Sequence, residues 1–160
     1  MDEPKRKKIT DPKEALSKAE HYCAYQERAQ QEVRDKLYEW GLWPDAVEQT
    51  ISELISGGFL NEERFAKAYT LGKFRQKGWG KIKIKQGLKL KRVPEVLIKK
   101  AVALIDGDAY TATLTDILIK KARILPEKDR FKRRYKLQHY AASRGYESDI
   151  ILDVLKDREL

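Results

Sequence analysis

The chain has 160 residues, and its 34 Lys and Arg against 25 Asp and Glu give a net charge of +9 at pH 7. The apolar fraction of 41% supports a packed core, whereas the charged fraction of 37% favours small helical units over one large globule. The lone cysteine excludes an internal disulfide, and the absence of a long apolar run excludes a membrane span. We therefore expect a cytoplasmic protein.

The positive charge is concentrated in the middle third. Residues 64–100 carry 13 basic residues and one acid, whereas residues 1–63 carry 9 basic and 14 acidic residues. A field of one sign at this density favours a polyanion or an acidic protein groove as the partner.

Residues 1–10 are too polar to fold alone and predict a flexible basic arm. Four consecutive basic residues, 5–8, could touch nucleic acid, although a solubilising tail is the favoured interpretation.

Residues 11–58 predict a first module of three helices. Asp11 can cap the first helix, and Pro12 suits its first position. The Glu14 side chain can reach back to the backbone amide of the capping residue. Pro44 marks the start of the third helix. Helical spacing of apolar residues predicts these inward positions: Ala15, Ala19, Tyr22, Val33, Leu37, Trp40, Val47, Ile51, Leu54 and Ile55.

Residues 59–107 predict a second, strongly basic three-helix module, and residues 108–160 a third. Asn61 caps the first of these helices, and breaks follow near Trp79, Pro94, Pro126 and Gly145. The predicted inward positions are Phe65, Ala66, Tyr69, Ile84, Leu88, Leu97, Ala101, Leu104, Ile105, Leu114, Ile117, Leu118, Phe131, Tyr135, Tyr140, Ile151, Val154 and Leu155.

The three modules form a weak internal repeat with a period of about 45–50 residues. Its clearest part superposes the turns at Gly41, Arg92 and Gly145, each followed by an apolar residue. The predicted fold class is all-α: three tandem helix-turn-helix-like modules in an elongated, curved, solenoid-like body.

Residues 81–91 are ambiguous on pattern alone. The strict alternation of Lys with Ile or Leu around Gln86-Gly87 is typical of a β-hairpin. As a helix, the same residues place Lys81, Lys85, Lys89 and Arg92 on one stripe.

The ordered set of short motifs resembles the RecX regulators of the bacterial recombinase RecA. It comprises EVRDKL at residues 32–37, GFLNEERFA at 58–66, KGWG at 77–80, and RGYESDI at 144–150. The chain departs from the family pattern at Ala29, where a capping serine is common, and at Arg92, where glycine is common.

This resemblance implies three tandem three-helix modules, with residues 81–91 helical. It also implies binding in the groove of a RecA filament on single-stranded DNA and damping of its ATPase, strand exchange and co-protease action, without catalysis or cofactor. A monomer is expected. The alternative is an autonomous, non-specific nucleic-acid-binding protein that acts without RecA.

The predicted RecA- or DNA-binding residues belong to the second module. Lysines at helical spacing neutralise phosphates or acidic side chains without reading sequence. Trp79 could stack on a base, although packing over a turn is the favoured interpretation for it. The set is Lys73, Arg75, Lys77, Trp79, Lys81, Lys83, Lys85, Lys89, Lys91 and Arg92.

A secondary basic patch is predicted on the middle helix of the third module, formed by Arg130, Arg133 and Arg134. No enzyme motif accompanies these surfaces. His21 and His139 lack partners at metal-ligand spacing, Cys23 reads as a core residue, and no phosphate-binding glycine loop occurs. We therefore expect neither catalysis nor a metal.

Overall fold

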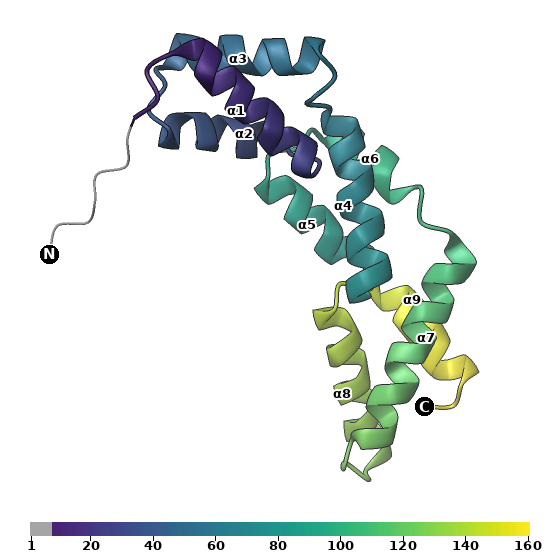
Figure 1. Cartoon of the computed structure of the whole chain (residues 1–160). Helices are drawn as coiled ribbons and strands as arrows, with labels where there is room; N and C mark the ends of the chain where they lie inside the picture. Colours follow the sequence, from purple (N-terminus) through teal and green to yellow (C-terminus); the bar gives the residue numbers. More distant parts are fainter. Residues whose placement is uncertain (1–7) are drawn as a thin grey trace, which may run out of the picture. The chain divides into compact units, whose positions relative to one another are not determined.

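The computed structural model describes residues 8–160 (Figure 1), which form nine α-helices and no strand. The all-α prediction is thereby confirmed, and residues 81–91 are helical rather than a hairpin. The chain divides into two compact units. One takes the chain up to Ala66 with Lys91–Val93, and the other takes Lys67–Leu90 with Pro94–Leu160.

The first unit is built on helices α1 (Pro12–Tyr25), α2 (Gln30–Glu39) and α3 (Pro44–Ser56), which pack on one another. As predicted, Asp11 caps α1 by accepting a hydrogen bond from the Lys13 amide at 3.0 Å. The core is a single apolar cluster that contains Ala15, Ala19, Cys23, Val33, Leu37, Val47, Ile51 and Leu54.

Helix α2 begins at Gln30, directly after Ala29, which provides no side-chain cap. The Glu32 carboxylate instead accepts a hydrogen bond from the Ala29 amide at 3.0 Å. The Gln30 amide donates to the Glu62 carboxylate at 2.8 Å. Carboxylates therefore satisfy the amides of Ala29 and Gln30, although Ala29 offers no side-chain acceptor to the amides of the following turn.

The described structure begins inside the stretch that the sequence predicts as an arm. Ile9 is buried, and its amide donates to the Trp40 carbonyl at 2.7 Å. Lys8 packs its side chain against Gly41. The remaining basic residues of the predicted arm, at positions 5–7, lie outside the described residues.

The predicted repeat is visible in the turns. Gly41, Arg92 and Gly145 adopt positive φ values of 103°, 58° and 97°. In the first and third of these turns, the next residue donates its amide back to the preceding helix, from Leu42 to the Leu37 carbonyl and from Tyr146 to the Ala141 carbonyl. Arg92 thus takes the left-handed position that glycine fills elsewhere, although a Cβ makes it less favourable.

The second unit contains most of α4 (Glu62–Lys77), all of α5 (Lys81–Leu90) and α6 (Glu95–Val102), and the last three helices. The last three helices are α7 (Gly107–Ile124), α8 (Arg130–Ser143) and α9 (Ser148–Asp157), and they pack against one another. Asn61, Asp106 and Asp129 each cap a helix through a backbone amide three residues later.

Four of the residues predicted to point inward are exposed. The exposed fractions are 45% for Ile55, 51% for Leu104, 87% for Phe131 and 67% for Tyr135, so those predictions are wrong. Ile55 lies in the last turn of α3, and Leu104 follows the end of α6. On α8 the buried stripe instead passes through Leu137 and Ala141.

A close approach of two glycines fixes the start of α5. A Cβ on Gly80 would lie 2.3 Å from the carbonyl carbon and oxygen of Gly145. The Gly80 amide donates to the Arg144 carbonyl at 2.8 Å, and the Ile82 amide donates to the Gly145 carbonyl at 2.9 Å. The turn between α8 and α9 is therefore joined backbone to backbone to the start of α5.

Candidate binding interface

Helix α5 carries the predicted lysine stripe on the flank of its buried side. Ile84 and Leu88 are fully buried, whereas Lys81 and Lys85 are half-buried and Lys89 is exposed. A turn of 100° per residue sets these three lysines along one edge of the helix. Because α5 contains no acidic residue, it has no carboxylate of its own to neutralise them.

The start of α5 rests on a buried tyrosine of α7. The Lys81 amide donates to the Tyr110 hydroxyl at 2.9 Å, and this hydroxyl donates to the Glu147 carboxylate. The Lys81 ammonium lies 4.7 Å from the centre of the Tyr110 ring. Burial, together with the bond to Glu147, raises the pKa of Tyr110. The hydroxyl therefore stays protonated and holds the helix start in place.

Further contacts join the end of α4 and the turn before α5 to the last three helices. The Tyr146 hydroxyl donates to the Gly78 carbonyl at 2.9 Å, and burial raises the pKa of Tyr146 to about 12. The guanidinium of Arg144 donates to the Lys77 carbonyl. The rings of Tyr110 and Tyr146 also contact each other, with centroids 4.9 Å apart and planes tilted by 32°. The backbone that carries the lysine stripe is therefore firmly positioned.

Trp79 is half-buried and serves as a platform for two lysines. The Lys73 ammonium lies 4.8 Å and the Lys83 ammonium 4.6 Å from the centre of its ring. Tyr69 meets the same ring edge-on at 6.4 Å, and Lys73 also lies 5.4 Å from the Tyr69 ring. Cation–π attraction of this kind orients ammonium groups while leaving their charge uncompensated.

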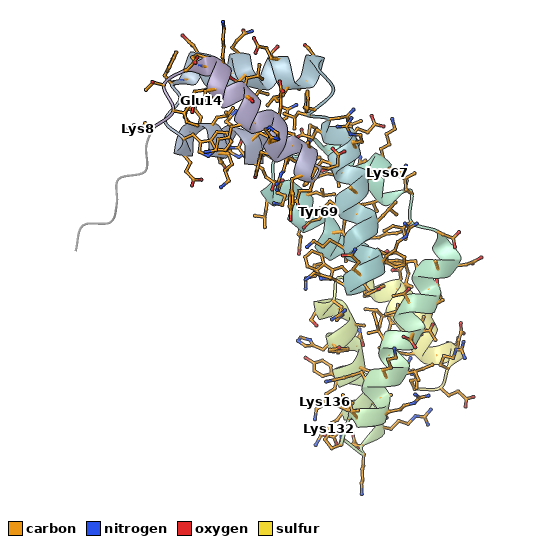
Figure 2. The ribbon with its side chains drawn as sticks, in the orientation of Figure 1. Lys8, Glu14, Lys67, Tyr69, Lys132 and Lys136 are labelled. Atoms are coloured by element: carbon orange, nitrogen blue, oxygen red, sulfur yellow. The ribbon has the colours of Figure 1, made fainter. Side chains whose placement is uncertain are left out.

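Trp79 therefore packs against Tyr69 and also orients the ammonium groups of Lys73 and Lys83. Figure 2 labels Tyr69 on α4, and a Cβ on Gly87 would come within 2.0 Å of the Tyr69 hydroxyl oxygen. Gly87 thus lets Tyr69 lie directly against α5. The ring edge of Tyr69 in turn supports Trp79 and its two lysines.

The remaining predicted residues of the second module have different surroundings. Arg75 and Lys77 are exposed in the last turn of α4. Lys91 and Arg92 follow the end of α5 and belong to the first unit, where Lys91 pairs with Glu32 at 3.3 Å. The predicted continuation of the lysine stripe to Arg92 is wrong, because α5 ends at Leu90 and Arg92 has left the helical conformation, with a φ of 58°.

The three arginines of the predicted secondary patch differ in what they contact. Arg133 donates to the Leu125 carbonyl at 3.1 Å, to the Glu127 carbonyl at 3.3 Å and to the Ala122 carbonyl. It therefore caps the C-terminal end of α7. Arg130 is exposed and Arg134 half-buried, and both remain on the surface of α8. Lys132 and Lys136 belong to the same run of basic residues and are exposed on this helix.

Other kinds of site find no support in the described part of the chain. Between residues 8 and 160, no group of three or more His, Cys, Asp or Glu could hold a metal ion. None of the helices seen there has the length and apolar character needed to cross a bilayer. Cys23 is buried, and burial raises the pKa of its thiol to about 11.

Comparison with known proteins gives three consecutive matches to family models. They are RecX, first three-helix domain, at residues 15–54; RecX, second three-helix domain, at residues 61–102; and RecX, third three-helix domain, at residues 108–155. The matched segments follow the order of the three predicted modules.

Individual relatives carry the same name. The chain is 30% identical over 131 residues to the regulatory protein RecX of Clostridium perfringens strain SM101, covering 81% of this chain but only 61% of that relative. It is 28% identical over 148 residues to the regulatory protein RecX of Prosthecochloris aestuarii, covering 92% and 95%. These names describe a regulator and no enzyme.

The fold has a counterpart among solved structures. The crystal structure of RecX from Lactobacillus salivarius superposes with a TM-score of 0.84 at 21% identity, covering 91% of this chain and 95% of that one. At this level of identity the agreement concerns the fold alone.

Proposed function

Because this chain belongs to the RecX family of regulatory proteins, we propose that it regulates a RecA recombinase. In this proposal it binds in the groove of the RecA filament on single-stranded DNA. Binding lowers the filament's ATPase, strand-exchange and co-protease activities. The protein contributes no catalytic group of its own.

The observation that carries the proposal is the set of cations around α5, a helix that has no acidic residue of its own. Lys73 and Lys83 lie over Trp79, and Lys81, Lys85 and Lys89 follow one edge of the helix. We call these five residues the α5 cluster. No acidic residue lies between Arg64 and Val93 in the sequence, and the next one along the chain is Glu95. Such a cluster suits DNA phosphates or acidic loops of a protein filament.

Rigid support adds to this argument. The aromatic contacts of Lys73, Lys81 and Lys83 hold three of the ammonium groups near fixed positions before any partner arrives. Preorganised side chains lose less conformational entropy on binding than free ones. The α5 cluster is thus better suited to a defined partner surface than a row of freely moving lysines would be.

The test replaces the three lysines of the stripe together, as Lys81→Glu, Lys85→Glu and Lys89→Glu. We expect this variant to bind RecA–single-stranded DNA filaments at least tenfold more weakly, because each reversed charge repels the surface that it attracted before. The matched control carries Lys13→Glu, Lys99→Glu and Lys156→Glu, which make the same change in net charge on exposed sites elsewhere.

Both variants should retain the far-ultraviolet circular dichroism of the parent protein. If the stripe variant is helical and binds filaments as tightly as the control, the α5 cluster is not the binding surface. If both variants lose binding equally, only net charge matters and the autonomous nucleic-acid binder is favoured. That outcome would agree with salt-sensitive binding to any polyanion.

A further inference from the structure

The outer face of α8 carries exposed aromatic rings that the proposed function does not use. Phe131 is 87% exposed and Tyr135 is 67% exposed. His139 continues the row one turn later, stacked on Tyr135 with ring centroids 5.9 Å apart and an interplanar angle of 20°. Exposed apolar side chains that lie together on one face often mark an interaction site.

The spacing of these rings suits an unstacked strand. Residues four apart on a helix lie almost in line and about 6 Å apart along its axis. Bases in duplex DNA are separated by only about 3.4 Å along each strand. The row therefore matches bases that are drawn apart in a single strand better than the closed stack of a duplex.

Cations lie on both sides of the row. Lys132 and Lys136, labelled in Figure 2, follow one flank of the rings, and Arg134 follows the other, because successive residues turn by 100° around the helix. No acidic residue occurs within α8 itself. Two carboxylates reach this surface from outside the helix. Glu127 pairs with Lys136 at 3.0 Å and has a lowered pKa through that contact, and Asp129 accepts a hydrogen bond from the Lys132 amide at 3.0 Å.

Two shallow hollows, wide open to solvent, lie beside the rings. One hollow of about 510 Å³ is lined by α8 residues alone, including Phe131, Arg134 and Tyr135. A second, of about 340 Å³, lies between α8 and the end of α7 and is lined by Tyr135, His139 and residues such as Leu125. Tyr135 and Lys136 border both hollows, so each ring has open space beside it for a flat group.

We propose that the outer face of α8 binds single-stranded DNA by stacking bases on Phe131, Tyr135 and His139 while Lys132, Arg134 and Lys136 hold the phosphates. Aromatic stacking combined with flanking cations is how proteins bind single strands without reading sequence. An acidic protein surface would satisfy the cations but would leave Phe131 and the outer faces of the Tyr135–His139 pair without flat partners. The choice of DNA over RNA rests on the proposed function, which brings a DNA strand to this protein.

The test measures binding to free oligonucleotides in the absence of RecA, so its outcome is separate from that of the filament experiment. The probes are a fluorescein-labelled thymidine oligomer and an abasic oligomer of equal length, which keeps the phosphates but lacks the bases. The variant is Phe131→Ala with Tyr135→Ala. The control is Tyr25→Ala, which removes a tyrosine of the first unit that is 84% exposed.

We expect the double variant to bind the thymidine oligomer about tenfold or more weakly, because each lost stack is worth at least a several-fold change in affinity. Its binding to the abasic oligomer should not change. Phe131→Tyr with Tyr135→Phe, which keeps both rings, should bind as the parent does. Since both rings are exposed, the urea midpoint of every variant should remain that of the parent.

Three results would overturn the proposal. The first is equal loss on the thymidine and abasic oligomers, which would mean that the rings do not contact bases. The second is unchanged thymidine binding by the double variant. The third is a parent protein that sediments as a dimer while the double variant sediments as a monomer, which would assign the face to a second copy of the chain. If the parent protein binds a uridine oligomer more tightly than the thymidine oligomer of equal length, the choice of DNA over RNA is overturned.

Discussion

Replacing Gly80 by alanine tests the junction that positions α5. The new Cβ would lie 2.3 Å from the Gly145 carbonyl carbon and oxygen and 2.4 Å from the Tyr146 amide nitrogen. All three are backbone atoms, so no side chain can swing aside to make room. The start of α5 and the turn between α8 and α9 must therefore move apart.

The cost of Gly80→Ala has two parts. Forcing a methyl group into a close-packed contact costs about 1–3 kcal/mol. The hydrogen bonds from Gly80 to Arg144 and from Ile82 to Gly145 are stretched or lost, at about 1 kcal/mol each. We expect the free energy of unfolding to fall by about 3–5 kcal/mol.

The assay is urea unfolding followed by circular dichroism. Gly72→Ala is the matched control, because Gly72 lies inside α4 and a Cβ there meets nothing within 4 Å. This control should raise the free energy of unfolding by about 0.5–1 kcal/mol, since alanine is the better helix former. Equal stability of the Gly80→Ala variant and the parent would refute the proposed close contact.

Three other perturbations test local features. Gly87→Ala should lower the free energy of unfolding by about 1–3 kcal/mol, because the new methyl group displaces the Tyr69 hydroxyl. Adding Tyr69→Phe should restore part of this loss. If the double variant is no more stable to urea than Gly87→Ala alone, the contact between Gly87 and the Tyr69 hydroxyl is contradicted. Arg133→Ala should lower the free energy of unfolding by about 2 kcal/mol, because the carbonyls at the end of α7 lose their donor. Arg134→Ala should leave it nearly unchanged. Equal urea midpoints for the two variants would argue against this capping role of Arg133. Because burial raises the pKa of Cys23 to about 11, its neutral thiol favours the folded state, and that contribution is complete below pH about 8.5 and is lost as the pH rises towards 11. Cys23→Ala should therefore flatten the pH dependence of stability between these values, and an unchanged slope would rule out this linkage.

The helical pattern of the sequence predicted most of the fold. The buried stripes through Ala15, Val33 and Ile84 follow the expected spacing, and the three turns of the repeat share a left-handed residue. This success has a physical basis, because helix faces and caps are determined by neighbours three or four residues apart in the chain.

The errors arise where the outcome depends on distant contacts. Phe131 and Tyr135 have the spacing of a buried pair, but no described element covers that side of α8. Arg133 resembles its neighbours in the sequence, although the end of α7 determines its role. The contact between Gly80 and Gly145 joins residues 65 positions apart, and no local pattern indicates it.

The α5 cluster illustrates both cases. The sequence indicated the lysines and the absence of acids, which are local properties. It did not indicate that Trp79 would lie beneath Lys73 and Lys83, or that Tyr110 would hold Lys81. Those contacts depend on how α4, α5 and α7 pack.

The most direct measurement is the single-stranded-DNA-dependent ATPase rate of RecA against added protein, at amounts well below one per RecA and with DNA in excess. If the protein regulates the filament, the rate should fall under these conditions, and the Lys81, Lys85 and Lys89 charge-reversal variant should have a much weaker effect. A rate that stays constant until the protein is sufficient to cover the DNA would contradict the proposed regulation and favour a plain nucleic-acid binder.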